Sequence, residues 1–261
     1  MPPNDVTLLL CNRGPVLAAL LDDPQDKRAL VEEVGVSRST VDRAIRDLEA
    51  AGLVERTDGA FAPTESGRLL YRAFDEFRSR ADAIADAQAI FDELRTDEPE
   101  PLPLSILDRC QVRHSRPPAR FEMIEEWIEM IDAADRIRAL VPTVAYDRPR
   151  QTLYENVLDD DIVYEPIYGT DVAKLFVEQR HEERREMVAS GNYHPFVCDV
   201  PPYALFLIER DGGMRIDISV YDDRGQLVGV VGSTDDDPVE WSERTYRRYR
   251  NRARSLTDAF R

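Results

Sequence analysis

Lysine is nearly missing from this sequence of 261 residues. Lys27 and Lys174 are the only lysines among 34 basic residues, so almost all positive charge is carried by arginine. Aspartate and glutamate total 51, which gives a formal net charge of −17. An acidic, lysine-poor surface suits a cytoplasm with molar salt, where a Debye length of about 3 Å screens self-repulsion. The composition therefore favours an extreme halophile as the source over an ordinary acidic protein.

Cysteine is also scarce, and the three cysteines stand far apart. Cys11, Cys110 and Cys198 have no CxxC spacing and no neighbouring Cys/His pair. A scattered, odd set argues against a disulfide framework and against a structural zinc site. We expect no metal site and interpret the three thiols as small buried apolar residues.

Long apolar runs are lacking as well. The first stretch, MPPNDVTLLLCNRGPVLAALL, is interrupted at residues 12–15, and no later stretch is more apolar. It is too short to span a bilayer and does not resemble an export signal. We therefore expect a cytoplasmic protein that does not enter the membrane.

The N-terminal part shows a helix-turn-helix pattern followed by a hairpin. The apolar positions and breakers predict helices over 6–21, 25–34 and 38–51. Gly14-Pro15 should bend or restart the first helix, Gly35 should end the second, and Ser37 should cap the third. Two short helices joined by a glycine turn are typical of a helix-turn-helix. Residues 53–62, with Thr57-Asp58-Gly59 as the turn, then predict a small β-hairpin, as a wing requires.

The exposed side of the third helix gives the candidate DNA-binding residues. We expect Arg38, Ser39 and Arg43 to reach base edges and Thr40 and Arg46 to hold phosphates. The full set also includes the cap and the wing: Ser37, Arg38, Ser39, Thr40, Arg43, Arg46, Arg56 and Gly59. Residues 1–63 nevertheless hold seven basic and eleven acidic side chains, which is not the usual basic footprint. A winged helix used for protein contacts therefore stays open as an alternative.

A connector follows the hairpin. Residues that are apolar except for Gln88 recur in steps of four and three at Leu70, Phe74, Phe77, Ala81, Ile84, Gln88 and Phe91. This spacing predicts a helix to about residue 94 that forms either a dimer seam or a packing face within the monomer, and we favour a homodimer. The domains are then a winged helix (1–63), a connector helix (64–94), a Pro-rich acidic linker (95–104) and an effector domain (105–261).

The last segment alternates strand and helix patterns and ends in hairpins. We expect strands near 110–114, 137–141, 162–167, 203–209, 216–221 and 227–231, and helices near 119–134, 150–158, 170–189 and 238–258. The turns at 211–213 and 223–225 indicate antiparallel pairing. The fold class is therefore α/β with a mixed sheet behind an N-terminal winged helix-turn-helix.

Two stretches of the sequence resemble known families. VGVSRSTVDRAIRDLEAAGLVERTDGAFAPTESGRLL resembles the winged helix of archaeal and bacterial one-component regulators. DAADRIRALVP, VYDDRGQLVGVVGSTDDD and VEWSERTYRRYR resemble the effector domain of archaeal methanogenesis-regulator-type (filamentation-regulator) proteins, which are numerous in haloarchaea. The second half is also similar to sugar-responsive archaeal regulators with catalytically inert phospholipase D folds. The resemblance implies a transcriptional regulator with a sensing domain and identifies no ligand residue.

No set of residues predicts catalysis. His194 is followed by Pro195 and Phe196, so the HxK spacing of phospholipase D is absent. His194 and Cys198 lie four residues apart without a glycine-rich oxyanion loop, which favours structural roles. No Walker motif and no GxGxxG occurs, so we expect no cofactor and no enzyme.

Two glycine-containing loops could hold a small anionic ligand. Tyr168-Gly169-Thr170 and Gly232-Ser233-Thr234 each follow a predicted strand and open a helix, where backbone N–H groups are free. Ordinary helix caps are the alternative for both loops.

Together the residues predict a sequence-specific regulator that binds double-stranded DNA and responds to an unidentified small-molecule or cellular signal. A protein-interaction adaptor, or an enzyme fused to a DNA-binding domain, are the alternative functions.

Overall fold

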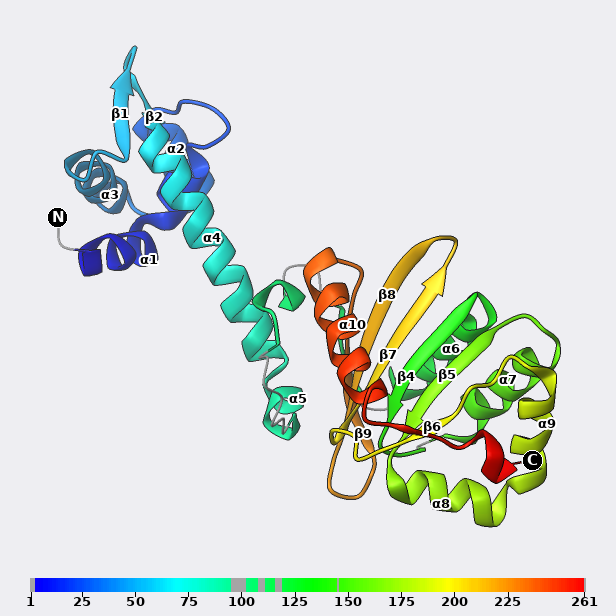
Figure 1. The fold of residues 1–261 in the computed structure, drawn as a ribbon. Helices are drawn as coiled ribbons and strands as arrows, with labels where there is room; N and C mark the ends of the chain where they lie inside the picture. The colour runs from blue at the N-terminus through cyan, green and yellow to red at the C-terminus, as the bar shows by residue number, and fades with distance from the viewer. Residues whose placement is uncertain (1–2, 95–101, 108–110, 116–118, 145, 261) are drawn as a thin grey trace. The chain divides into compact units, whose positions relative to one another are not determined.

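The computed structural model describes all residues except 1–2, 95–101, 108–110, 116–118, 145 and 261 (Figure 1). Most of the predicted linker and Cys110 lie outside the described residues. The chain divides into two units, Met1–Ala81 and Asp82–Arg261, and the division falls inside helix α4 (Glu65–Asp86). Among the described helices, none is long and apolar enough to cross a membrane.

The first unit has the predicted winged helix-turn-helix. Its helices are α1 (Pro3–Ala19), α2 (Lys27–Val34) and α3 (Arg38–Ala50), followed by the antiparallel hairpin of β1 (Val54–Thr57) and β2 (Ala60–Pro63). Helix α1 continues through Gly14-Pro15, so the expected restart there is wrong. Cys11 is exposed, which corrects its expected burial.

The turns of this unit follow from local side-chain chemistry. Asp26 caps α2 by accepting hydrogen bonds from the backbone N–H groups of Arg28 and Ala29. Gly35 ends the helix with φ 71°, a left-handed conformation that glycine adopts without strain. The core face of α3 is then buried through Val41, Ala44, Ile45 and Leu48.

Thr64 and Gly67 attach α4 to the wing. The Thr64 hydroxyl donates to the Gly52 carbonyl (2.7 Å) and accepts from the Gly67 N–H (3.1 Å). A Cβ at Gly67 would stand 2.1 Å from the Leu53 carbonyl oxygen, so no larger residue fits without moving the backbone. The Thr-x-x-Gly spacing therefore sets how closely α4 approaches the hairpin.

The connector is two helices instead of the single helix expected to residue 94. Helix α4 ends at Asp86, Ala87 takes a non-helical conformation (φ −90°, ψ 4°), and α5 runs from Gln88 to Glu93. Leu70 and Phe74 pack on the core of the first unit, whereas Ile90 on α5 is buried in the second unit. The exposed part of the predicted seam, with Phe77 and Ile84, therefore lies on α4.

The second unit is built on a mixed sheet, as predicted, but the sheet has eight strands, because the two-residue strands β6 and β10 were not expected. The strands are β3 (Gln111–His114), β4 (Arg136–Val141), β5 (Val163–Tyr168), β6 (Phe196–Val197), β7 (Tyr203–Arg210), β8 (Gly213–Tyr221), β9 (Leu227–Ser233) and β10 (Arg254–Ser255). Their order is β10-β6-β5-β4-β7-β8-β9-β3. Strands β4, β5 and β6 are parallel, and the pairs from β4 through β7, β8 and β9 to β3 are antiparallel.

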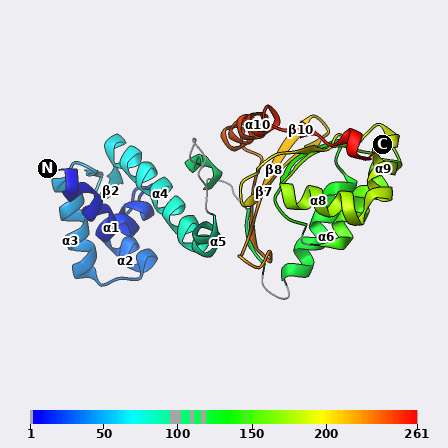
Figure 2. The same cartoon turned by 60° about the horizontal axis from the view of Figure 1, so that its bottom comes forward.

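Helices cover both faces of this sheet (Figure 2). One face carries α6 (Ala119–Asp132), α7 (Asp147–Leu158), α8 (Thr170–Gln179) and α9 (His181–Ser190). The other carries α5, the short helix η1 (Leu104–Leu107) and α10 (Asp236–Arg250). The helix predicted over 170–189 is two helices because Arg180 leaves the helical conformation (φ −135°, ψ 35°). The last helix is shorter than predicted and is followed by β10 and η2 (Thr257–Phe260).

The acidic composition gives a prediction for stability in salt. The net charge of −17 should destabilise the compact chain wherever it is not screened. We expect the thermal unfolding midpoint to rise by about 5 °C or more between about 0.2 and 3 M KCl, because the Debye length falls to a few ångströms and the repulsion between carboxylates is screened. Circular dichroism melts across this range would measure the rise. A flat or falling midpoint would contradict the halophilic interpretation.

Candidate nucleic-acid interface and ligand cavity

The start of α3 presents the predicted DNA-binding face. Arg38, Ser39, Arg43 and Arg46 are exposed on the side opposite the buried stripe of the helix. Ser37 instead serves the helix itself: its hydroxyl accepts from the Thr40 N–H (3.2 Å) and lies 2.8 Å from the Thr40 hydroxyl. Ser37 and Thr40 thus fix where the helix begins, and the arginines and Ser39 project beyond it.

The acidic residue within this face is paired. Asp42 lies 2.7 Å from the Lys27 ammonium group on α2. The hydrogen bond from Lys27 lowers the pKa of Asp42, with smaller contributions from Arg38 and Arg46. Asp47, further along α3, pairs with Arg13 on α1 at 3.0 Å. Three arginines therefore face solvent beside a carboxylate whose charge is partly compensated.

The wing carries the remaining two predicted DNA-binding residues. Arg56 is exposed on β1, with its guanidinium 5.9 Å from the centre of the Phe61 ring. Asp58 and Gly59 both take positive φ, 50° and 86°, which is typical of a tight hairpin turn. The hairpin projects from the helices of its unit (Figure 1), so Arg56 and Gly59 lie on a protruding element.

The two predicted ligand loops do not form one site. Between β5 and β9 the sheet has one parallel and three antiparallel strand pairs, so β5 and β9 run in opposite directions. The loop after Tyr168 and the loop after Ser233 therefore leave the sheet at opposite ends of its strands. Gly169 and Thr170 begin α8, and the Gly169 N–H donates to the Val141 carbonyl (3.0 Å). The buried Ser233 hydroxyl accepts a hydrogen bond from the Asp235 N–H (3.1 Å), which is typical of a turn before a helix, here α10. Thr170 and Ser233 therefore do not share one site, and Thr234 is an exposed residue of the turn before α10.

Gly232 has a packing role. It lies opposite Asp217 on β8, whose buried carboxylate pairs with Arg215 at 2.9 Å. A Cβ at Gly232 would stand 2.3 Å from the Asp217 carboxylate. Burial raises the pKa of Asp217, and the neighbouring Arg215 and Arg113 oppose that shift. The glycine thus makes room for a buried ion pair.

A cavity of about 130 Å³ lies on the face of the sheet covered by α6 to α9. Tyr168 lines it, but the other five predicted ligand residues do not. The carboxyl ends of β4 and β5 contribute to its wall through Val141 and Tyr168, the last residues of these strands. Most of its wall is apolar, with Ile124, Trp127, Leu153, Phe176 and Phe206 among the lining residues.

Arginine and tyrosine side chains make the polar part of the wall. Arg150 on α7 and Arg184 on α9 both line the cavity, together with Tyr164 and Tyr168. Burial raises the pKa of both tyrosines, so they are neutral hydrogen-bonding groups at ordinary pH. The Tyr168 hydroxyl accepts a hydrogen bond from Tyr193 at 3.0 Å.

Sequence reasoning missed both arginines of the cavity. The sequence predicts a helix over 170–189 but does not mark Arg184 as buried, and Arg184 is 2% exposed. Arg180, Arg184 and Met187 follow each other at helical spacing, which is a weak signal because the neighbouring Arg185 is an ordinary exposed residue. The sequence pattern alone does not distinguish the buried arginine from the exposed one.

Two histidines and one cysteine have contacts typical of structural residues. The Nε2 atom of His114 lies 2.7 Å from the Asp86 carbonyl, and that of His181 lies 3.2 Å from the Ala259 carbonyl. Cys198 is half-buried, and burial raises the pKa of its thiol, which keeps it a weak nucleophile. Within the described part of the chain, no three His, Cys, Asp or Glu side chains gather as a metal site.

The chain thus has a winged helix, a type of domain that commonly binds DNA, followed in sequence by a helix-covered mixed-sheet domain. The family model described as "Methanogenesis regulatory protein FilR1, middle domain" matches residues 120–252, more than half of the chain. The model described as "HVO_A0261 N-terminal domain" matches residues 5–86. The chain therefore belongs to the FilR1 family of regulatory proteins. This confirms the resemblance inferred from the sequence. No curated protein sequence matches the chain.

Several solved structures are similar to the chain at low identity. TrmBL2, an archaeal chromatin protein, is 12% identical with a TM-score of 0.42, over 96% of this chain and 98% of that one. Nuc from Salmonella typhimurium, a phospholipase D family member, is 12% identical with a TM-score of 0.41, over 56% and 97%. NucT from Helicobacter pylori is 8% identical with a TM-score of 0.41 over the same shares. These similarities are too weak to indicate an activity.

Proposed function

We propose that the protein is a cytoplasmic, sequence-specific DNA-binding regulator of transcription, and that its second unit binds a small molecule as the signal. The observation that carries the first part is the exposed start of α3. Arg38, Arg43 and Arg46 project there from a helix whose other face is fully buried. A helix held in this way by a helix-turn-helix is the element that enters the major groove in such domains.

The wing and the family support the same function. Arg56 and Gly59 lie on the hairpin, which in winged helices contacts the neighbouring backbone or minor groove. The matching family is also described as a methanogenesis regulatory protein, which supports a role in regulation. The cavity of the second unit supports a small-molecule signal because concave, mostly apolar sites with few polar groups are typical ligand sites.

A homodimer is the proposed working form. Phe77 and Ile84 lie seven residues apart on α4 and are 64% and 44% exposed. Two copies of this stripe would form a short seam, and a two-fold regulator can read two half-sites.

The test is selection of duplex DNA from a random pool by the full chain in molar KCl. We expect an enriched motif of two half-sites, and we expect its enrichment to disappear in the triple variant Arg38→Ala, Arg43→Ala, Arg46→Ala. Arg28→Ala is the matched control, because it removes an exposed arginine that lies on α2 and pairs with Glu32 of the same helix. Circular dichroism would establish that each variant folds.

The adaptor function makes the opposite prediction. Residues 1–63 carry more acidic than basic side chains, which favours a protein partner over a phosphate backbone. If the folded chain enriches no motif at any salt concentration, the DNA-binding proposal is contradicted and the adaptor function replaces it.

A further inference from the structure

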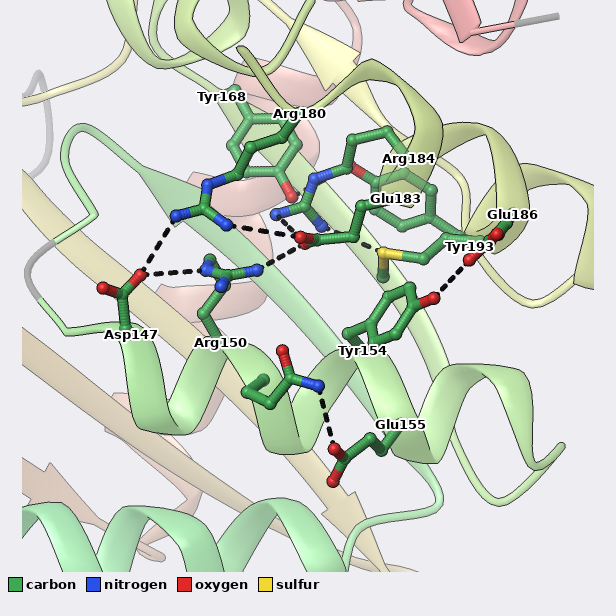
Figure 3. A network of polar contacts seen from close by, with 12 residues as sticks. Asp147, Arg150, Tyr154, Glu155, Tyr168, Arg180, Glu183, Arg184, Glu186 and Tyr193 are labelled. Atoms are coloured by element: carbon green, nitrogen blue, oxygen red, sulfur yellow. Dashed lines mark hydrogen bonds and ion pairs between the residues drawn. The ribbon is translucent and has the colours of Figure 1, made fainter.

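One partly buried carboxylate pairs with three guanidinium groups beside the cavity. Glu183 lies 2.5 Å from Arg150, 3.4 Å from Arg184 and 3.4 Å from Arg180 (Figure 3). Asp147 is a second partner for Arg150 and Arg180, at 3.3 Å from each, but it is exposed to solvent.

The network carries more positive than negative charge. Arg150, Arg180 and Arg184 share two carboxylates, and of these only Glu183 (18% exposed) is shielded from water beside Arg184 (2%) and Arg150 (11%). A buried charge without a full partner is costly. The Nε atom of Arg184 has no hydrogen-bond partner among the described residues, and one of its terminal nitrogens contacts the Met187 sulfur instead. The charge of the network and the free Arg184 donor therefore favour the binding of one more negatively charged group.

The rest of the cavity excludes strongly polar ligands. Its wall is mainly aliphatic and aromatic, with Trp127 and Phe206 packed edge to face at 4.2 Å between ring centres. A sugar would lose hydrogen bonds to water that such a wall does not replace. A phosphate dianion would bring more negative charge than the network leaves uncompensated. The volume of about 130 Å³ is close to that of a cavity of about 150 Å³ that holds benzene.

We propose that this cavity binds a small organic monocarboxylate with a compact apolar body, such as an aromatic or branched aliphatic acid. Its carboxylate would accept hydrogen bonds from Arg184 and Arg150, and its body would pack against the apolar wall. Arginine suits this role because its planar fork matches a carboxylate. This inference rests on the proposed small-molecule signal and names its chemical class.

Benzoate is the probe for a first test, and benzamide is its neutral counterpart of the same shape. Trp127 lines the cavity and Trp241 lies on the other face of the sheet, so tryptophan fluorescence of the full chain in molar KCl reports binding. Trp127→Phe should remove the signal. We expect benzoate to change the fluorescence and raise the unfolding midpoint, with benzamide binding about tenfold or more weakly.

The variants separate charge from packing. Arg184→Met keeps the volume and apolar contacts of the side chain, and Arg150→Gln keeps a hydrogen-bond donor. Each should weaken benzoate binding about tenfold or more. Arg185→Gln, next to Arg184 but exposed, should leave binding unchanged.

Three results would overturn the proposal. They are equal binding of benzamide and benzoate, unchanged benzoate binding in both folded variants, and no binding of a panel of aromatic and branched carboxylates up to about 10 mM. If benzoate binds but leaves DNA affinity unchanged, the site stands and the signalling part of the proposed function fails. If ligand binds and no DNA motif exists, the regulator function fails separately.

Discussion

Phe77→Asp and Ile84→Asp should each turn the protein into monomers and lower its affinity for a two-half-site operator by about 10²–10⁴-fold. A dimer binds its second half-site as an intramolecular step, and a monomer loses that gain in effective concentration. The position of both residues on one stripe of α4 motivates the prediction, since a charge placed in an apolar seam has no compensation.

Leu69→Asp is the matched control for these variants. Leu69 is 56% exposed on the same helix but lies off the stripe, so its replacement should leave the mass and the DNA affinity unchanged. Multi-angle light scattering and fluorescence anisotropy in molar KCl would measure both quantities. A monomeric wild type at working concentration would show that α4 packs within the chain and that the seam interpretation is wrong.

The winged helix was predictable because its signals are local. Ser37 caps α3 through its own hydroxyl, Gly35 supplies a left-handed residue, and Asp58-Gly59 makes the hairpin turn. Each of these depends on a few neighbouring residues and needs no knowledge of the tertiary fold. The periodic stripe of α3 then identifies the buried face, and the exposed arginines follow as its complement.

Breaks within the long helices were not predictable. Ala87 and Arg180 are good helix formers, yet each leaves the helical conformation. In both places the following helix packs into the core of the second unit. The Ile90 side chain packs against Gly229 of β9, and the Arg184 guanidinium lies over the Phe176 ring. Tertiary contacts therefore override local propensity at these two residues.

The ligand site could not be predicted from the sequence for a related reason. The loop after β5 and the loop after β9 look alike in sequence. The two strands run in opposite directions, however, so the loops lie at opposite ends of the strands. The cavity is assembled from α6, α7, α8, α9 and five strand or loop segments that are distant in the chain. Tyr168 was found because it ends a strand, whereas Arg150 and Arg184 were missed because buried and exposed arginines have the same helical spacing.

Losing Arg43 and losing Arg46 should have different consequences for DNA recognition. Both side chains are exposed on α3, and the Arg43 Nε donates to the Ser39 carbonyl at 3.3 Å, which lays its stem along the helix start. We expect Arg43 to contact a base edge and Arg46 to contact phosphate. An arginine can bond guanine through two hydrogen bonds, so Arg43→Ala should cost about 1–3 kcal/mol and relax one position of the operator.

Arg46→Ala should instead weaken all operator variants alike and reduce the salt dependence of binding, because a phosphate contact carries no sequence information. A library of single-base operator variants, measured by anisotropy against Arg43→Ala, Arg46→Ala and the control Arg28→Ala, separates the two effects. Changed preference in the first and uniform loss in the second are the expected pattern. If neither variant alters binding while the wild type still holds its operator, α3 is not the helix that reads the DNA.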